Sequence, residues 1–179
     1  TSKSYTADSL KDFTYVSLMI TIPVAIVTAA QTKIRNFDEF IADLKANPGK
    51  RNYANSGLAD GLQMMIFKRV TETEFETVRF NGAAPAFQAM FSGSADFTFT
   101  TIGGSKVFAD AGKLNFIVTM GSRRSTLTPD VPSMVEVGGP QLRPRLVEFV
   151  KSIPETWFGV VGPANVPAPI VATLNQASV

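Results

Sequence analysis

Three short stretches combine small and hydroxyl-bearing residues in a way that suits the binding of an anion. They are Asn55-Ser56-Gly57, Asn81-Gly82-Ala83 and Thr100-Thr101. Each follows a strand-like run and precedes a run with helical spacing of its apolar residues. A helix that begins there directs free backbone N–H groups and its positive end at the junction, and glycine allows close approach to the backbone. The stretches therefore predict binding of an anion rather than a chemical reaction.

The residue types that most enzymes use as nucleophiles or general bases are missing. The sequence contains no cysteine and no histidine, which removes thiol nucleophiles, histidine bases and Cys/His zinc sites. Four acids lie in separate predicted elements and form no recognisable motif: Asp60, Asp96, Asp110 and Asp130. An enzyme that uses carboxylates or lysine, or a hard-metal site, remains an alternative. We expect no catalytic residue, no metal and no cofactor.

The composition is typical of a globular protein with a small net charge. Of 179 residues, 45% are apolar and 18% are charged, and the formal net charge is +2. No basic run is longer than a pair such as Arg123-Arg124, whereas nucleic-acid binding requires clustered basic residues. We therefore expect no nucleic-acid partner. The Arg123-Arg124 pair is expected to hold in place the turn-rich segment that crosses from one part of the fold to another. The alternative is that the pair binds a ligand carboxylate.

An uncharged stretch covers residues 13–32, and its length would suit a membrane-spanning helix. Its β-branched and hydroxyl residues and the interrupting Pro23 instead favour two buried strands with a break near that proline. Asp8 and Asp12 precede the stretch, so we expect no signal peptide in this chain.

Strand-like and helix-like segments alternate through the centre of the chain. Strands are expected at 52–55, 77–80, 95–99 and 114–120, and helices at 62–69, 86–91 and 106–111. This alternation is typical of an α/β fold with a mostly parallel sheet flanked by helices. Ligands of such sheets bind beyond the carboxyl ends of the strands, where the three stretches fall.

Further elements are expected on both sides of this centre. Residues 36–47 predict a helix that Asn36 can cap. Residues 140–152 contain prolines and basic residues and predict a solvated excursion. Residues 157–161 predict a strand, and a final helix is expected from Ile170.

Each anion-binding stretch also has a purely structural interpretation. Ser56-Gly57 is typical of a turn with a helix cap, and Asn81-Gly82 is typical of a hairpin turn. Thr100-Thr101 can satisfy backbone groups at a strand end. Asp96, inside an apolar run, is either an edge-facing polar residue or a buried residue with a partner.

The order of short motifs along the chain resembles that of the Bug/TctC family, the substrate-binding proteins of tripartite tricarboxylate transporters. Eight blocks carry the resemblance: residues 11–18 (KDFTYVSL), 45–50 (KANPGK), 53–57 (YANSG), 80–86 (FNGAAPA), 93–97 (GSADF), 111–114 (AGKL), 124–136 (RSTLTPDVPSMVE) and 157–164 (WFGVVGPA). Each block is short, but their shared order over nearly the whole chain makes the resemblance specific.

The resemblance implies a type II periplasmic-binding-protein fold, in which two α/β lobes close on an organic carboxylate. It implies ligand contacts from Asn55, Ser56, Gly57, Asn81, Gly82, Ala83, Thr100 and Thr101. It also implies a periplasmic protein, monomeric when complete, that delivers its ligand to a membrane permease. Residues 1–29 would then belong to the first lobe and a crossing strand, residues 30–153 would form a complete second lobe, and residues 154–179 would return to the first.

Three features depart from the family pattern. The loop that contains Asp60 is shorter than the family's loop and lacks its histidine, and Asp60 would oppose an anion by like charge. Phe80 stands where the family has tyrosine. The family's upstream segment and C-terminal tail are not represented, so the chain would supply one lobe and part of another. A small-molecule sensor domain of the same fold is the alternative, although the sequence has no recognisable helix-turn-helix.

Overall fold

The computed structural model describes residues 8–153 and 156–178 of the chain. These residues form two compact units. The larger unit begins at Pro23, and the smaller unit combines the described residues up to Ile22 with those from Thr156 onward.

The larger unit is built on a five-stranded sheet in the order β4-β3-β5-β2-β6. Its strands are β2 (Val24–Ala29), β3 (Asn52–Asn55), β4 (Glu76–Arg79), β5 (Phe97–Thr101) and β6 (Leu114–Thr119). β3 pairs in parallel with β4 and β5, whereas β2 pairs antiparallel with β5 and β6. All strands except β2 therefore run in one direction, which confirms the predicted mostly parallel sheet.

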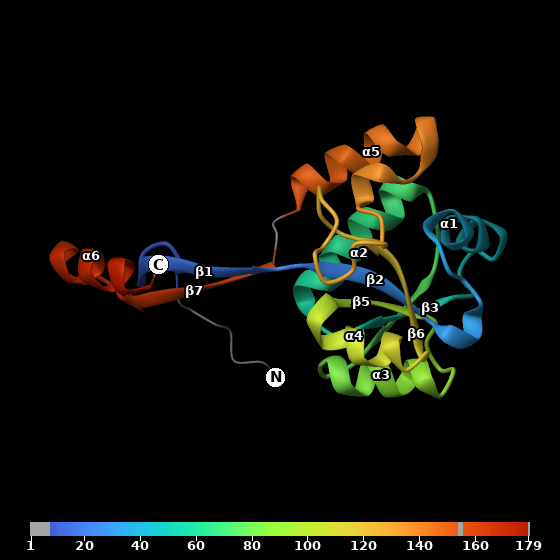
Figure 1. Cartoon of the computed structure of the whole chain (residues 1–179), viewed down its shortest axis with the longest axis horizontal. Helices are drawn as coiled ribbons and strands as arrows, with labels where there is room; N and C mark the ends of the chain where they lie inside the picture. Colours follow the sequence, from blue (N-terminus) through green and yellow to red (C-terminus); the bar gives the residue numbers. More distant parts are fainter. Residues whose placement is uncertain (1–7, 154–155, 179) are drawn as a thin grey trace. The chain divides into compact units, whose positions relative to one another are not determined.

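Helices cover both faces of this sheet and make a three-layer unit (Figure 1). One face packs against α1 (Phe37–Ala46), α2 (Leu58–Thr71) and α5 (Gly139–Ser152). The other packs against α3 (Ala83–Phe91) and α4 (Ile102–Asp110). Each face has its own apolar core, with Phe40, Phe67 and Phe97 in the first and Phe87 and Met90 in the second. Short 3-10 helices occur at η1 (Ala30–Thr32) and η2 (Met134–Glu136).

Local side-chain chemistry fixes where the scaffold helices begin. The Glu39 N–H donates to the Asn36 side chain at 2.9 Å, which confirms the predicted cap of α1. Apolar residues at helical spacing then place one face of α1 against the core, where Phe37, Phe40 and Leu44 are buried. The helix predicted at residues 36–47 therefore forms, over Phe37–Ala46.

The expectation of a solvated excursion at 140–152 is wrong, because these residues form α5. Pro140 lies in the first helical turn, where its missing N–H has no intrahelical partner to lose. Leu146 and Phe149 are buried against the first core. The free energy gained by burying this apolar face outweighs the cost of the interior Pro144.

The smaller unit is a two-stranded antiparallel ribbon with one helix. β1 (Phe13–Ile22) pairs with β7 (Thr156–Pro163), and α6 (Ala168–Ala177) packs on β1. The predicted strands with a break at Pro23 are confirmed, but the predicted burial holds only for β2. Val16 is the one buried residue of β1, because only α6 is available to cover the ribbon. None of the described helices has the length and apolar character needed to cross a membrane.

The boundary between the two units lies at Ile22–Pro23. Residues 24–29 form β2, which is hydrogen-bonded on both sides to β5 and β6. Two-sided pairing places β2 inside the larger sheet.

Candidate functional site

The three predicted stretches all lie at one edge of the larger sheet. β3, β4 and β5 run in the same direction, so their carboxyl ends share an edge, which we call the carboxyl edge. The first stretch joins β3 to α2, the second joins β4 to α3, and the third ends β5 and precedes α4. The Phe80 N–H donates to the Asn55 carbonyl oxygen at 2.8 Å, which ties the first two junctions together. The structure thus brings residues from three separate segments to one place.

The junction between β4 and α3 offers unsatisfied backbone donors. Within the described part of the chain, no group accepts a hydrogen bond from the N–H groups of Gly82, Ala83 or Ala84. Gly82 has φ 102° and ψ 177°, a conformation that side-chain-bearing residues rarely adopt. Asn81 and Ala83 are exposed. The start of α3 therefore presents several donors and a positive helix end to solvent, which is the arrangement that binds anions.

At the junction between β3 and α2, the donors of Ser56 and Gly57 are already occupied, whereas the N–H groups of Leu58 and Ala59 in the first turn of α2 have no acceptor among the described residues. Asp60 accepts from the Ser56 N–H at 3.2 Å and from the Ser56 hydroxyl at 3.1 Å. The Gly57 N–H donates to the buried Asn55 side chain at 2.9 Å. A Cβ at Gly61 would collide with the Asn55 amide nitrogen, so a larger residue where α2 crosses this side chain would have to displace it. Of the predicted contacts, Ser56 and Gly57 therefore donate within the protein.

A tyrosine that the sequence analysis did not select lies next to this junction. Tyr53 is fully buried, and its hydroxyl has no hydrogen-bond partner among the described residues. Burial raises the pKa of the Tyr53 hydroxyl, and the nearby Asp60 carboxylate raises this pKa further. The spacing in the sequence could have indicated Tyr53, because residues two apart in a strand share a face and Tyr53 precedes Asn55 by two.

At the junction between β5 and α4, hydrogen bonds to backbone carbonyl groups hold the start of the helix in place. Thr100 and Thr101 are half-buried and pair with Ala25 and Val24 of β2. The Ile102 N–H donates to the Pro23 carbonyl oxygen at 3.0 Å. The Ser105 hydroxyl donates to the Thr101 carbonyl oxygen at 2.8 Å. These contacts fix the start of α4, with exposed Gly103 and Gly104 in its first turn.

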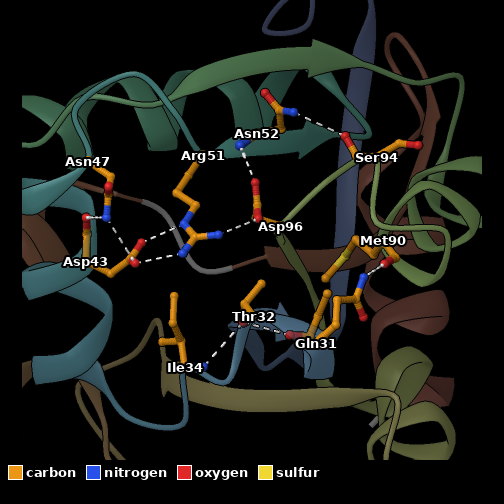
Figure 2. A network of polar contacts seen from close by, with 11 residues as sticks. Gln31, Thr32, Ile34, Asp43, Asn47, Arg51, Asn52, Met90, Ser94 and Asp96 are labelled. Carbon is orange, nitrogen blue, oxygen red and sulfur yellow. Dashed lines mark hydrogen bonds and ion pairs between the residues drawn. The ribbon is translucent and has the colours of Figure 1, made fainter.

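The opposite edge of the sheet, which we call the amino edge, carries a network of paired charges (Figure 2). The Arg51 guanidinium donates twice to Asp43 at 2.7 Å and once to Asp96 at 3.0 Å. Asp96 also accepts from the Asn52 N–H at 2.7 Å. Hydrogen bonds to Asp43 are the main cause of a raised pKa at Arg51. Of the two alternatives for Asp96, the structure gives the partnered one, and its role is to join the starts of β3 and β5.

Asp110 and Arg124 also have structural partners. Asp110 binds Lys106 at 2.8 Å on the exposed face of α4. Arg124 binds Glu136 at 3.0 Å and donates to the Pro129 carbonyl oxygen at 3.1 Å, which holds the segment that follows β6. Across residues 8–153 and 156–178, no three potential metal-ligating side chains gather.

The fold defines a class of protein. It is that of periplasmic-binding proteins of type II, an α/β fold with a mostly parallel sheet flanked by helices. The sequence profile of the TctC family, described as "Tripartite tricarboxylate transporter family receptor", matches residues 2–179. The chain belongs to this family, and the resemblance drawn from its sequence motifs is confirmed.

Individual relatives are similar over nearly all of this chain. Protein BugT of Bordetella pertussis is 28% identical over 169 residues, which cover 93% of this chain and 49% of BugT. MatC (Rpa3494) from Rhodopseudomonas palustris with bound malate has a TM-score of 0.77 at 27% identity, covering 99% of this chain and 57% of that one. R. palustris Rpa4515 with adipate has a TM-score of 0.82 at 22% identity, covering 98% and 56%. The chain therefore spans about half the length of its relatives.

Proposed function

We propose that this chain is part of a periplasmic solute-binding protein that captures an organic carboxylate. The complete protein acts as a monomer without catalysis, closes two lobes on the ligand, and delivers it to the membrane permease of a tripartite transporter. The observation that carries the proposal is the row of free N–H groups at Gly82, Ala83 and Ala84, placed at the carboxyl edge of a TctC-family fold.

The chemistry of this edge suits a carboxylate. A carboxylate has two oxygen acceptors, and the first turn of α3 offers several donors together with the positive end of the helix dipole. The positive φ of Gly82 turns the chain directly into α3, and the open space at its Cα leaves room for a ligand oxygen. Asn81 and Thr101 supply side-chain donors at the flanking positions. No proton transfer or bond cleavage is required of any of these groups.

Two relatives support the ligand class. MatC is described with bound malate and Rpa4515 with adipate, and both compounds are organic carboxylates. This chain matches the family profile over residues 2–179, so a ligand of the same general class fits the free donors of α3.

The division into units supports capture between lobes. The larger unit is a self-sufficient three-layer domain, which we assign to one lobe. The smaller unit is a two-stranded ribbon with little buried surface, a kind of structure that is marginally stable alone. We assign it to part of the other lobe, in agreement with a chain half as long as its relatives.

A thermal-shift assay with a panel of acids tests this proposal. The acid panel comprises malate, succinate, adipate, hexanoate, 4-aminobutanoate and 6-aminohexanoate, with succinamide and adipamide as neutral controls. An acid at 100 times its dissociation constant stabilises the protein by about 2.7 kcal/mol, which raises Tm by roughly 5–10 °C at this chain length. The proposal requires such a shift with at least one acid and none with the amides. Equal shifts with acids and amides, or no shift with any acid, would overturn it.

A further inference from the structure

Two neighbouring junctions of the carboxyl edge differ in how their donors are satisfied. The β3–α2 and β4–α3 junctions are adjacent because β3 and β4 pair in parallel. At the start of α3 the first backbone donors have no acceptor within the described residues. At the start of α2 the Ser56 donors are held by the Asp60 carboxylate and the Gly57 donor by Asn55. The β3–α2 junction therefore already holds a carboxylate, whereas the first turn of α3 contains no acidic residue.

The Asp60 carboxylate changes what the neighbouring position accepts. A second carboxylate at the start of α2 would find the Ser56 donors occupied and would face a like charge. Two partly desolvated unit charges about 5 Å apart repel strongly. A group that donates hydrogen bonds and carries positive charge would instead be attracted. The arrangement therefore favours an ammonium group over a carboxylate beside α2.

A second feature at the same place also indicates a polar ligand end. Tyr53 is fully buried, yet its hydroxyl has no partner within the described residues and lies near Asp60. Buried hydroxyl groups without a partner are rare in folded proteins, and they often mark functional positions. A phenolic oxygen accepts hydrogen bonds as well as donating them. The Tyr53 hydroxyl and the Asp60 carboxylate thus form a polar pair at this junction, of which the half-exposed Asp60 is the part that a ligand can reach.

We propose that Asp60 selects the ligand and that this site prefers an amino carboxylate to a dicarboxylate. The carboxylate of the ligand binds at Gly82, Ala83 and Ala84, and its protonated amino group faces Asp60. The inference rests on the proposed function, because it requires a carboxylate ligand at the carboxyl edge. It adds the chemistry of the second ligand end, which free backbone amides alone do not specify.

An acid in the first turn of a helix also stabilises the helix, and Asp60 does so for α2. This capping role involves the same hydrogen bonds to Ser56 and makes no demand on the ligand. The two roles differ in one measurable quantity, the ratio of affinities for ligands that match in length and differ in end-group charge. Stability alone would change if Asp60 acted only as a cap.

The test compares two matched pairs, succinate with 4-aminobutanoate and adipate with 6-aminohexanoate, by isothermal titration calorimetry on the whole chain. The variant is Asp60→Asn, which keeps an oxygen acceptor for Ser56 and removes the charge. The control is Asp110→Asn, which removes the same charge from the exposed Lys106 pair on α4. We expect the unmodified chain to bind the amino acid of at least one pair about 10-fold or more tighter than the diacid. Asp60→Asn should reduce that ratio by about 10-fold, and Asp110→Asn should leave it unchanged.

Each other outcome overturns the inference in a distinguishable way. If the diacids bind the unmodified chain as tightly as the matched amino acids, or if Asp60→Asn leaves the ratio unchanged, Asp60 does not select the ligand. Binding of the acids would then still support the proposed function. If neither protein binds any of the four compounds or any other member of the acid panel, both the proposed function and this inference fail. Circular dichroism of each variant identifies any loss of binding that comes from unfolding.

Discussion

The two edges of the larger sheet contrast in how they treat polar groups. At the amino edge, Arg51 joins Asp43 and Asp96, so charged groups at the starts of β3 and β5 have partners. At the carboxyl edge, the start of α3 keeps free donors, and Gly82 adopts a conformation that is unfavourable for other residues. The contrast indicates that the amino edge stabilises the fold, whereas the carboxyl edge retains unpaired groups that a ligand can satisfy.

Arg51→Ala should produce the largest loss of stability and leave the carboxyl edge intact. It would leave Asp43 and Asp96 without their cation, although these side chains keep 19% and 21% of their surface exposed. We expect a loss of about 2–3 kcal/mol, at the low end for a broken buried pair because of this exposure. Urea denaturation measures the loss, and calorimetry should find unchanged affinity for any acid that binds.

Lys106→Ala is the matched control, because its pair with Asp110 is exposed and lies within one helix. It should cost no more than about 0.5 kcal/mol. Equal losses for the two variants would contradict the structural role assigned to the amino edge.

Gly82→Ala should damage binding at the carboxyl edge. At φ 102° alanine is strained by about 1–3 kcal/mol, although its Cβ would meet no other atom within 4 Å. Relief of that strain would move the first donors of α3, so we expect acid affinity to fall about 10-fold or more. Gly112→Ala also places alanine at a positive φ, 71°, with equally open space, but Gly112 lies before β6 at the amino edge. A similar loss of affinity in both variants would remove the distinction between the edges.

Gly61→Ala tests the packing of α2 over Asn55. The new Cβ would collide with the Asn55 amide nitrogen and turn the amide away from the Gly57 N–H. The energetic cost of overpacking should exceed the gain in helix propensity. We therefore expect the free energy of unfolding, measured by thermal denaturation, to fall by about 1 kcal/mol. Gly103→Ala, whose Cβ would meet nothing within 4 Å, should leave stability unchanged or slightly raised. A stabilising Gly61→Ala would show that Asn55 tolerates displacement.

Glu136→Gln should give the smallest loss of stability, and this loss should disappear in acidic solution. Hydrogen bonds from the Ser133 N–H and hydroxyl, followed by Arg124, hold the pKa of Glu136 below its ordinary value of 4.5. A lowered pKa in the folded state means that the contribution is complete above the unfolded value and is lost as pH falls through the folded value. The stability difference between the two proteins should therefore be greatest above about pH 5 and shrink toward pH 3. A difference that is independent of pH would contradict this assignment.

Much of the fold could be predicted from local patterns. Periodicity and the Asn36 cap located α1, and small residues between strand-like and helix-like runs located the three junctions. Parallel topology then required those junctions to share an edge. The helical nature of 139–152 was missed because prolines dominated the local pattern, although Leu146 and Phe149 are buried. The exposure of β1 could not be predicted, since an apolar strand pattern does not say what is available to cover it.

The site itself was only partly predictable. Types and spacing selected Gly82 and Ser56, but no local pattern distinguishes a junction with free donors from one whose donors are occupied. That distinction depends on the Asp60 side chain folding back on Ser56. The proximity of Tyr53 to Asp60 likewise follows from the packing of α2 over β3, which is a tertiary feature.

The measurement that tests the central claim most directly is a nitrogen-15 NMR titration of the chain with each member of the acid panel. We expect the largest backbone amide shifts at Gly82, Ala83 and Ala84, and little change at Asn52 and Gly112 of the amino edge. Succinamide and adipamide at the same concentration should leave all of these amides unchanged. Largest shifts at the amino edge, or no shift of the α3 amides with any acid, would contradict the claim that this edge binds a carboxylate.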